Sequence, residues 1–139
     1  MQLTKGYKQL IEEARARIRT LPLDEARALL GNHDVLFVDI RDVRELEREG
    51  MIPDAFHAPR GMLEFWVDPE SPYYKDVFGS GKQFVLYCAS AWRSSLAAAA
   101  LTDMGVPRVA HLEGGFKAWK ASGAPVGQRE HHQHGEPPR

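Results

Sequence analysis

Residues 84–105 read FVLYCASAWRSSLAAAALTDMG, and this stretch decides the fold class of the chain. Its first four residues are continuously apolar, which is typical of a strand that is covered on both faces of a parallel sheet. After a short loop, Ser94 or Ser95 is suited to cap a helix that runs through Met104 and ends at Gly105. The stretch therefore predicts a strand, a turn and a helix, with Cys88 at the carboxyl end of the strand.

The flanking sequence repeats this alternation of strand and helix. Apolar runs predict strands over 35–38 and 109–112 and a brief edge strand over 56–58. Helices are expected over 23–30, 42–50 and 116–122. Strands that alternate with helices along the whole chain predict an α/β domain with a parallel sheet, in which ligands bind beyond the carboxyl ends of the strands.

Two signals lie between the predicted strands at 35–38 and 84–87. Asp42, with Glu45 three positions later, resembles a capping box that opens the helix ending at Gly50. Residues 59–82 are expected to be mostly loop, with aromatic side chains that fold it back on the domain as a partial lid or as satellite core. Of these two arrangements, we predict satellite core.

Length and charge limit the classes of protein to which the chain can belong. At 139 residues it has the size of one domain, and 18 Lys plus Arg against 19 Asp plus Glu leave a net charge of -1. No global field then draws it to nucleic acid or to a membrane surface, so small partners are expected. The chain shows neither a secretory signal pattern nor an apolar run of the roughly 20 residues that span a bilayer, so a cytoplasmic location is predicted.

The composition divides the chain into an amphipathic helix within residues 1–20, a domain over 21–126 and a flexible tail over 127–139. Apolar residues of the first part recur at helical spacing, which predicts a helix that packs on the domain or on a second copy of the chain. This helix is a candidate homodimer surface. The tail histidines lack the further ligands that a metal site needs, so we expect no metal and no other cofactor; they are His131, His132 and His134.

Cys88 is the only cysteine of the chain, and its position favours a reactive thiol over an inert core residue. Loop N–H groups, the amino end of the following helix and the Arg93 guanidinium can converge on the sulfur and stabilise a thiolate. The same donors suit a persulfide anion or an incoming oxyanion. We therefore predict an ionised Cys88 in a pocket open to solvent. Since there is no second thiol, a persulfide on Cys88 must pass to an external acceptor in a two-step, ping-pong pattern.

Three motifs in unbroken order resemble those of single-domain rhodaneses. Their active-site loop, in which arginine follows the catalytic cysteine by five residues and serine comes next, is matched by Tyr87-Cys88-Ala89-Ser90-Ala91-Trp92-Arg93-Ser94. A second motif is matched by Val38-Asp39-Ile40-Arg41, with Gly50, Ile52, Pro53 and Ala55 downstream. The closing motif is matched by Leu112-Glu113-Gly114-Gly115-Phe116-Lys117-Ala118-Trp119. The resemblance covers about residues 21–126 and leaves out the leading helix and the tail.

The resemblance implies a three-layer rhodanese-like fold, a parallel sheet flanked by helices, with an extra N-terminal helix. It also implies a sulfurtransferase in which Cys88 is the nucleophile and Arg93 assists with anionic donors. Donors would be thiosulfate, polysulfide or a persulfide, and acceptors would be cyanide, a small thiol or a protein cysteine. The implied substrate-binding residues are Ala89, Ser90, Ala91, Trp92 and Ser94. The implied supporting residues are Asp39, Arg41 and Arg60. An ordinary ion pair is an equally open interpretation for Asp39 and Arg41, and for Arg60 we favour a solvated arginine over one that binds an anionic substrate.

The chain departs from the family pattern at Ala91 and Trp92, which replace a glycine and a smaller polar residue. These changes reduce backbone freedom and access around the sulfur, so thiosulfate is expected to be a poor donor. Two alternative functions stay open. Phosphatases of the same fold have a loop one residue longer, with arginine at the position where this chain has Ser94. Non-catalytic binding modules often lack the cysteine that is present here.

Overall fold

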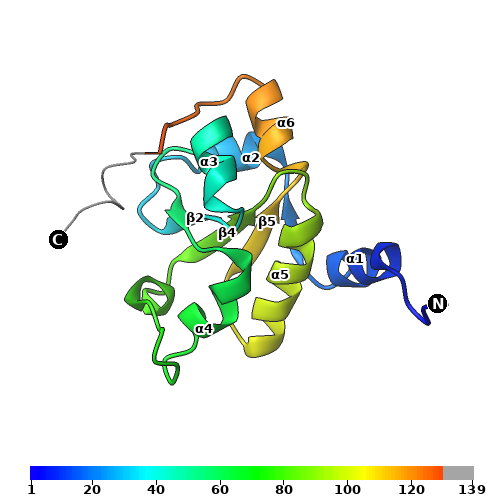
Figure 1. Ribbon diagram of the computed structural model, residues 1–139. Helices are drawn as coiled ribbons and strands as arrows, with labels where there is room; N and C mark the ends of the chain where they lie inside the picture. Colours follow the sequence, from blue (N-terminus) through cyan, green and yellow to red (C-terminus); the bar gives the residue numbers. More distant parts are fainter. Residues whose placement is uncertain (130–139) are drawn as a thin grey trace.

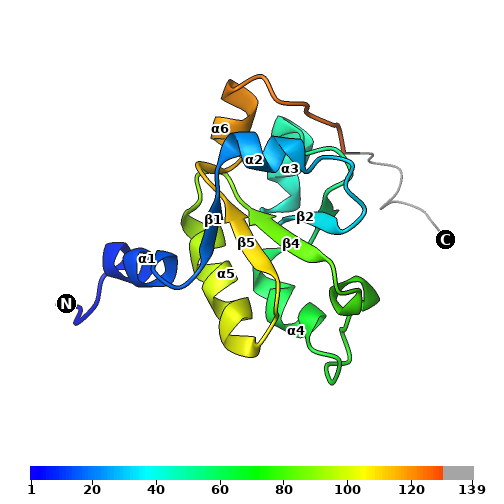
Figure 2. The ribbon, with the colours of Figure 1, turned by 180° about the vertical axis from the view of Figure 1, so that it is seen from behind.

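A parallel sheet forms the centre of the domain in the computed structural model, which describes residues 1–129 (Figure 2). Its five strands are β1 Arg19–Leu21, β2 Val35–Asp39, β3 Phe56–His57, β4 Gln83–Tyr87 and β5 Val109–Leu112. They are arranged in the order β1-β5-β4-β2-β3, so β4 is central and β3 lies at an edge, as predicted. The tail histidines and most of the tail predicted over 127–139 lie outside the described residues.

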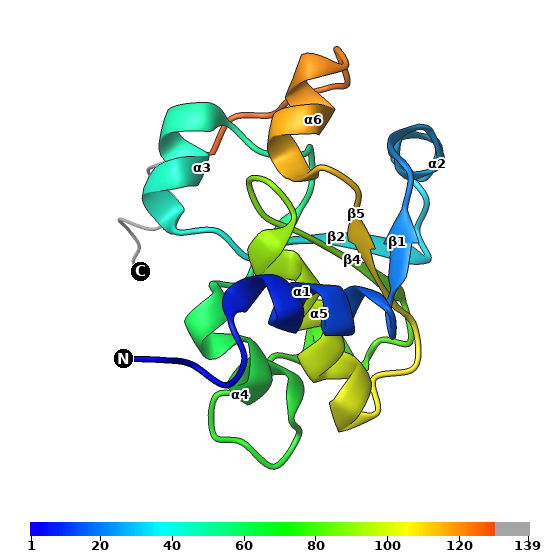
Figure 3. The ribbon, with the colours of Figure 1, turned by 90° about the vertical axis from the view of Figure 1, so that its right-hand side faces the viewer.

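Helices cover both faces of this sheet (Figure 3). One face carries α2 Leu23–Ala28, α3 Val43–Glu49 and α6 Gly115–Ala121. The opposite face carries α4 Leu63–Val67 and α5 Trp92–Met104, and α1 Tyr7–Arg15 lies against α5 on the outside (Figure 1). The three-layer α/β arrangement predicted from the sequence is therefore confirmed.

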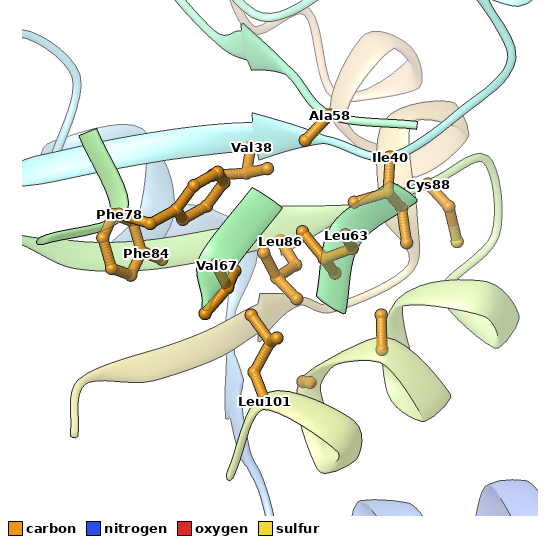
Figure 4. Packing of buried hydrophobic residues seen from close by; sticks show 12 residues of the cluster. Val38, Ile40, Ala58, Leu63, Val67, Phe78, Phe84, Leu86, Cys88 and Leu101 are labelled. Carbon is orange, nitrogen blue, oxygen red and sulfur yellow. The ribbon is translucent and has the colours of Figure 1, made fainter. Parts of the chain in front are cut away.

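Two clusters of buried apolar side chains fill the spaces between the layers. The cluster on the α5 side contains Leu86, Leu101 and Cys88, and Figure 4 shows these side chains between the sheet and the helices. The cluster on the α6 side contains Tyr87 and Trp119. Neighbouring residues of β4 alternate between the two clusters because successive side chains of a strand point to opposite faces.

The long segment after β3 belongs to the core. It contains α4 and two short 3-10 turns, Arg60–Met62 and Asp76–Gly79, where the sequence predicted mostly loop. Leu63, Val67 and Phe78 of this segment are buried in the α5-side cluster. The prediction that this segment packs as core is thus confirmed, although its residues join the main cluster instead of a satellite one. Since α4 has only five residues, its packing on this cluster stabilises it as a helix.

The leading helix packs on the domain, with Ala14 buried and the Tyr7 ring 5.1 Å from the Trp92 ring. Leu3 and Leu10 stay exposed, and the homodimer surface stays a prediction. After the helix, residues 19–21 add the edge strand β1, which the sequence analysis did not predict because three residues carry too short a pattern. Within residues 1–129 no helix has both the length and the apolar character needed to cross a bilayer.

Candidate active site

Cys88 follows β4 directly and lies on the α5 side of the sheet, near Ile40 and Leu63 (Figure 4). Its side chain is only 1% exposed, whereas the sequence predicted a thiol open to solvent. Two features explain the difference. The alternation of β4 turns Cys88 into the same buried cluster as Leu86, and the first turn of α5 lies close enough for the Ser94 N–H to donate to the sulfur.

The Cys88 sulfur accepts a hydrogen bond from the backbone N–H of Ser94, at 3.3 Å. Ser94 is the third residue of α5, and the first N–H groups of a helix have no partner within the helix. The sequence predicted Ser94 or Ser95 as the cap, but the helix already begins at Trp92. Ala91 at the N-cap position makes no side-chain cap. An N–H group that a capping side chain would have taken is therefore available to the sulfur.

The amino end of α6 orients the first two peptide groups of the loop. The Phe116 N–H donates to the Cys88 carbonyl at 2.8 Å, and the Lys117 N–H donates to the Ala89 carbonyl at 3.0 Å. In a trans peptide the N–H points opposite to the carbonyl, so the N–H groups of Ala89 and Ser90 point away from α6. The amino end of α6 thereby fixes the orientation of both peptide groups.

Gly115 makes this close approach of α6 to the loop possible. A Cβ atom on Gly115 would lie 2.6 Å from the Ala89 carbonyl oxygen and 2.8 Å from the Cys88 carbonyl oxygen. Its φ angle of +70° also favours glycine. The second glycine of the Gly114-Gly115 pair is thus required by the loop that holds Cys88.

Ala91 has the left-handed backbone conformation, with φ 74° and ψ 0°. This conformation costs a residue with a Cβ atom about 1–2 kcal/mol, and such strain is typical of functional loops. Both the N–H and the hydroxyl of Ser95 donate to the Ala91 carbonyl, at 3.1 and 2.6 Å. A glycine at this position would adopt the same backbone without strain.

We expect Ala91→Gly to raise the free energy of unfolding by about 1 kcal/mol, because the strain of the left-handed backbone is removed. Urea unfolding followed by circular dichroism measures the change. Ala89→Gly is the matched control in the same loop, and since Ala89 is not left-handed, we expect this variant to lose stability. Equal effects of the two variants would contradict the strain at Ala91.

Arg93 forms a bidentate ion pair with Glu45 of α3. The two terminal nitrogens of Arg93 lie 2.9 and 3.0 Å from the two carboxylate oxygens of Glu45. The pair lowers the pKa of Glu45 and raises the pKa of Arg93, in each case mainly through these hydrogen bonds. The Arg93 guanidinium also interacts electrostatically with the Cys88 thiol. A cation thus lies beside the sulfur, but a carboxylate already occupies one donor on each of its two terminal nitrogens.

Asp39 and Arg41 form a second ion pair, which is completely buried, at 0% and 1% side-chain exposure. Arg41 donates to both Asp39 oxygens at 3.0 and 2.7 Å and to the Gly50 carbonyl at 2.7 Å. Its guanidinium lies over the Phe116 ring, 4.4 Å from the centroid. Burial lowers the pKa of Arg41, but the hydrogen bonds and charge of Asp39 raise it by more. The pair connects the ends of β2 and α3 to the start of α6.

The remaining predicted residues lie in different environments. Ser90 and Trp92 are exposed, and Ala89 lines a cavity of about 400 Å³ between α3 and α6. The other residues of its wall are Arg41, Glu45, Arg48, Glu49, Phe116, Lys117, Lys120 and Ala121. Arg60 is half-buried and donates to Glu64 at 2.8 Å, within its own segment. No three His, Cys, Asp or Glu side chains of residues 1–129 gather where a metal ion could be held.

A histidine that the sequence analysis did not single out supports Ser94. His111 of β5 is buried, and its two ring nitrogens lie 3.0 Å from the Ser94 hydroxyl and 2.9 Å from the Thr20 hydroxyl. Burial, with a smaller contribution from the charge of Arg15, lowers the pKa of His111 to about 4. The neutral imidazole therefore links β1, β5 and α5. Its one signal in the sequence is a polar residue inside an apolar strand.

We expect the free energy of unfolding to fall by about 2 kcal/mol between about pH 7.5 and pH 5, because His111 takes up a proton only on unfolding. The sign follows from a native pKa below the unfolded value of about 6.5: the unfolded chain binds more protons as the pH falls. Urea unfolding at a series of pH values measures it. A His111→Gln chain should show a flatter profile, and an unchanged slope in that variant would exclude His111 as the cause.

Comparisons with known proteins cover most of the chain. The rhodanese-like domain profile matches residues 22–122. A sulfurtransferase of Allochromatium vinosum is 39% identical over 101 residues, which are 73% of this chain and 86% of that protein. A solved protein of unknown function from Rhodopseudomonas palustris, described as a possible tyrosine phosphatase, is 52% identical, with a TM-score of 0.88 and coverage of 91% of this chain and 97% of that one. The polysulfide-sulfur transferase homodimer of Wolinella succinogenes is 28% identical, with a TM-score of 0.67 and coverage of 94% and 93%.

Proposed function

The chain belongs to the rhodanese-like family, and from this premise we propose that it transfers sulfane sulfur by way of a persulfide on Cys88. Sulfurtransferases among its relatives support sulfur transfer in general. The observation that carries the specific proposal is the hydrogen bond from the Ser94 N–H, at the amino end of α5, to the sulfur of the only cysteine. A donor placed there favours the anionic sulfur that both the nucleophile and its persulfide require.

The reaction has two displacement steps at sulfur. The Cys88 thiolate attacks the outer sulfur of the donor, the S–S bond of the donor breaks, and its electron pair leaves with sulfite from thiosulfate or with a shorter polysulfide. An acceptor thiolate or cyanide then attacks the terminal sulfur of Cys88. The products are a new persulfide or thiocyanate, and the electron pair returns to the Cys88 thiolate.

The residues around the sulfur have separate roles in this proposal. The Ser94 N–H holds the anionic sulfur, while the N–H groups of Ala89 and Ser90, which point away from α6, receive the outer sulfur. Arg93 attracts the anionic donor. Since the thiol is buried, residues 89–93 have to move to admit a donor, and the strained Ala91 is where that movement costs least.

Mass spectrometry of the intact chain tests the covalent step. After exposure to thiosulfate or polysulfide and removal of excess donor, the native chain is expected to gain the mass of one sulfur atom, and cyanide is expected to remove it. Polysulfide should load the chain more completely than thiosulfate, since a linear sulfur chain is narrower than the sulfonate end of thiosulfate and the bulky Trp92 belongs to the loop that follows Cys88. A chain that gains no sulfur from any donor would favour a non-catalytic binding module.

The acceptor has to come from outside the chain, because Cys88 is the only thiol. We place the reaction in the cytoplasm, where small thiols and protein cysteines are kept reduced. Parallel initial-rate lines are the kinetic pattern of such a two-step transfer.

Phosphatase activity is the alternative that the Rhodopseudomonas palustris relative raises. The loop of this chain argues against it. Arginine stands five residues after Cys88, and the sixth position is Ser94, whose N–H is bound to the sulfur and whose hydroxyl is bound to His111. A phosphate group would therefore lack the longer ring of donors that a phosphatase loop provides.

A further inference from the structure

The pairing of Arg93 with Glu45 limits which donors can approach Cys88. Both terminal nitrogens of Arg93 are bound to the two oxygens of one carboxylate, at 2.9 and 3.0 Å. The Arg93 side chain is 42% exposed and that of Glu45 is 21% exposed, so the pair lies at the surface beside a buried thiol. An anionic donor that binds Arg93 meets a carboxylate in the place where its own oxygens would bind.

The Glu45 side chain is held in place beside Arg93, because it belongs to the capping box of α3. The Glu45 oxygen that lies 2.9 Å from Arg93 also accepts the N–H of Asp42 at 3.0 Å. The Asp42 side chain in turn accepts the N–H of Arg44, at 2.8 Å. Exposed ion pairs are usually worth little because their side chains are mobile, but this carboxylate is fixed by the backbone of its own helix.

We propose that Glu45 is a specificity-determining residue, which competes with dianionic donors such as thiosulfate for Arg93 and so favours donors of lower charge. The inference rests on the proposed sulfur transfer and deepens it, by naming the charge class of the preferred donor. It also gives a reason for poor use of thiosulfate that does not depend on the size of Trp92. Persulfides and organic polysulfides do not need the Arg93 donors to the same extent, because they carry less charge.

Glu45→Gln tests this competition without loss of the helix cap. Glutamine keeps a side-chain oxygen that can accept the Asp42 N–H, so the capping box is retained while the negative charge is removed. Glu49→Gln is the matched control. Glu49 lies one turn later on α3, lines the same cavity and pairs with Arg48 and Lys120, not with Arg93. The two variants therefore carry the same change in net charge.

Sulfate is the probe, because it is a dianion without sulfane sulfur and its binding does not require any transfer. We expect titration of the native full-length chain and of both variants, followed by NMR shifts of the loop amides, to show roughly three- to tenfold tighter sulfate binding in Glu45→Gln and little change in Glu49→Gln. The advantage of Glu45→Gln should shrink as sodium chloride is raised, since the competition is electrostatic. In parallel, the KM for thiosulfate should fall in Glu45→Gln alone.

Two results would overturn the inference. Equal tightening in both variants would show a general effect of charge, and no tightening in Glu45→Gln, with an unchanged unfolding midpoint, would show that Arg93 does not receive the anion. The proposed sulfur transfer is tested separately by the mass gain of the native chain. If that gain is absent while sulfate binds Glu45→Gln more tightly, the competition for Arg93 is supported and the proposed transfer reaction is wrong.

Discussion

Replacing Cys88 by serine is expected to abolish sulfur transfer, with turnover reduced by about three orders of magnitude or more. The serine hydroxyl stays protonated at neutral pH and forms no stable bond to sulfane sulfur. No other residue can substitute for Cys88, because the chain has a single cysteine. The mass gain expected from polysulfide should disappear in the same variant.

The fold should tolerate this substitution, so loss of activity would report on chemistry. Serine is close to cysteine in size, and its oxygen can accept the Ser94 N–H that the sulfur accepts at 3.3 Å. Ala89→Ser is a suitable control, since it adds a hydroxyl to the same loop and leaves the thiol in place. Sulfur loading that persists in Cys88→Ser would refute the persulfide. Hydrolysis of an aryl phosphate by the native chain that is lost in Cys88→Ser would support the phosphatase alternative instead.

The second large effect is expected from Asp39→Ala, which should lower the free energy of unfolding by about 3–5 kcal/mol. The substitution removes the carboxylate that pairs with the buried Arg41 guanidinium, which keeps the Gly50 carbonyl, two aromatic rings and a weaker charge interaction with Glu45. The Tyr87 hydroxyl also loses its hydrogen bond with Asp39. That bond and the charge of Asp39, together with burial, raise the pKa of Tyr87 in the native chain. Urea unfolding of purified protein measures the loss.

A double variant makes the test independent of whether Asp39→Ala folds. Asp39→Leu combined with Arg41→Met removes both charges, and it should recover much of the stability, because apolar residues of similar volume often replace a buried ion pair well. Asp103→Ala breaks an exposed ion pair with Arg17 and should change the free energy of unfolding by less than about 1 kcal/mol. If Asp39→Ala costs no more than Asp103→Ala, the buried pair does not stabilise the fold.

The double variant also separates support from catalysis. Asp39 holds Arg41, whose guanidinium lies over the Phe116 ring at the start of α6, and the N–H groups there hold the carbonyls of Cys88 and Ala89. A double variant that folds but transfers sulfur more slowly would support a positioning role. Unchanged turnover would leave the pair with a role in stability alone.

Much of the fold could be predicted from short stretches of sequence. Apolar runs predicted both ends of β2, β4 and β5 to within one residue. The spacing of Asp42 and Glu45 predicted the cap of α3. The predicted N-cap of α5, Ser94 or Ser95, was wrong by three or four residues, since the left-handed Ala91 begins the helix without a side-chain cap. A conformation that is strained for alanine carries no local signal, because the tertiary structure holds it in place.

The position of Cys88 at the end of a buried strand follows from the sequence by itself, since alternation, capping and turn formation depend on residues only a few positions apart. The tertiary structure alone decided what surrounds that sulfur. The order β1-β5-β4-β2-β3 brings His111 to Ser94, and the packing of α3 and α6 brings Glu45 to Arg93 and the Phe116 N–H to the Cys88 carbonyl. The two side-chain pairs lie 17 and 48 residues apart in the sequence, and the Phe116 contact is made by backbone atoms. No local sequence pattern therefore predicts them. The burial of the thiol has the same origin, because it depends on how all the layers pack.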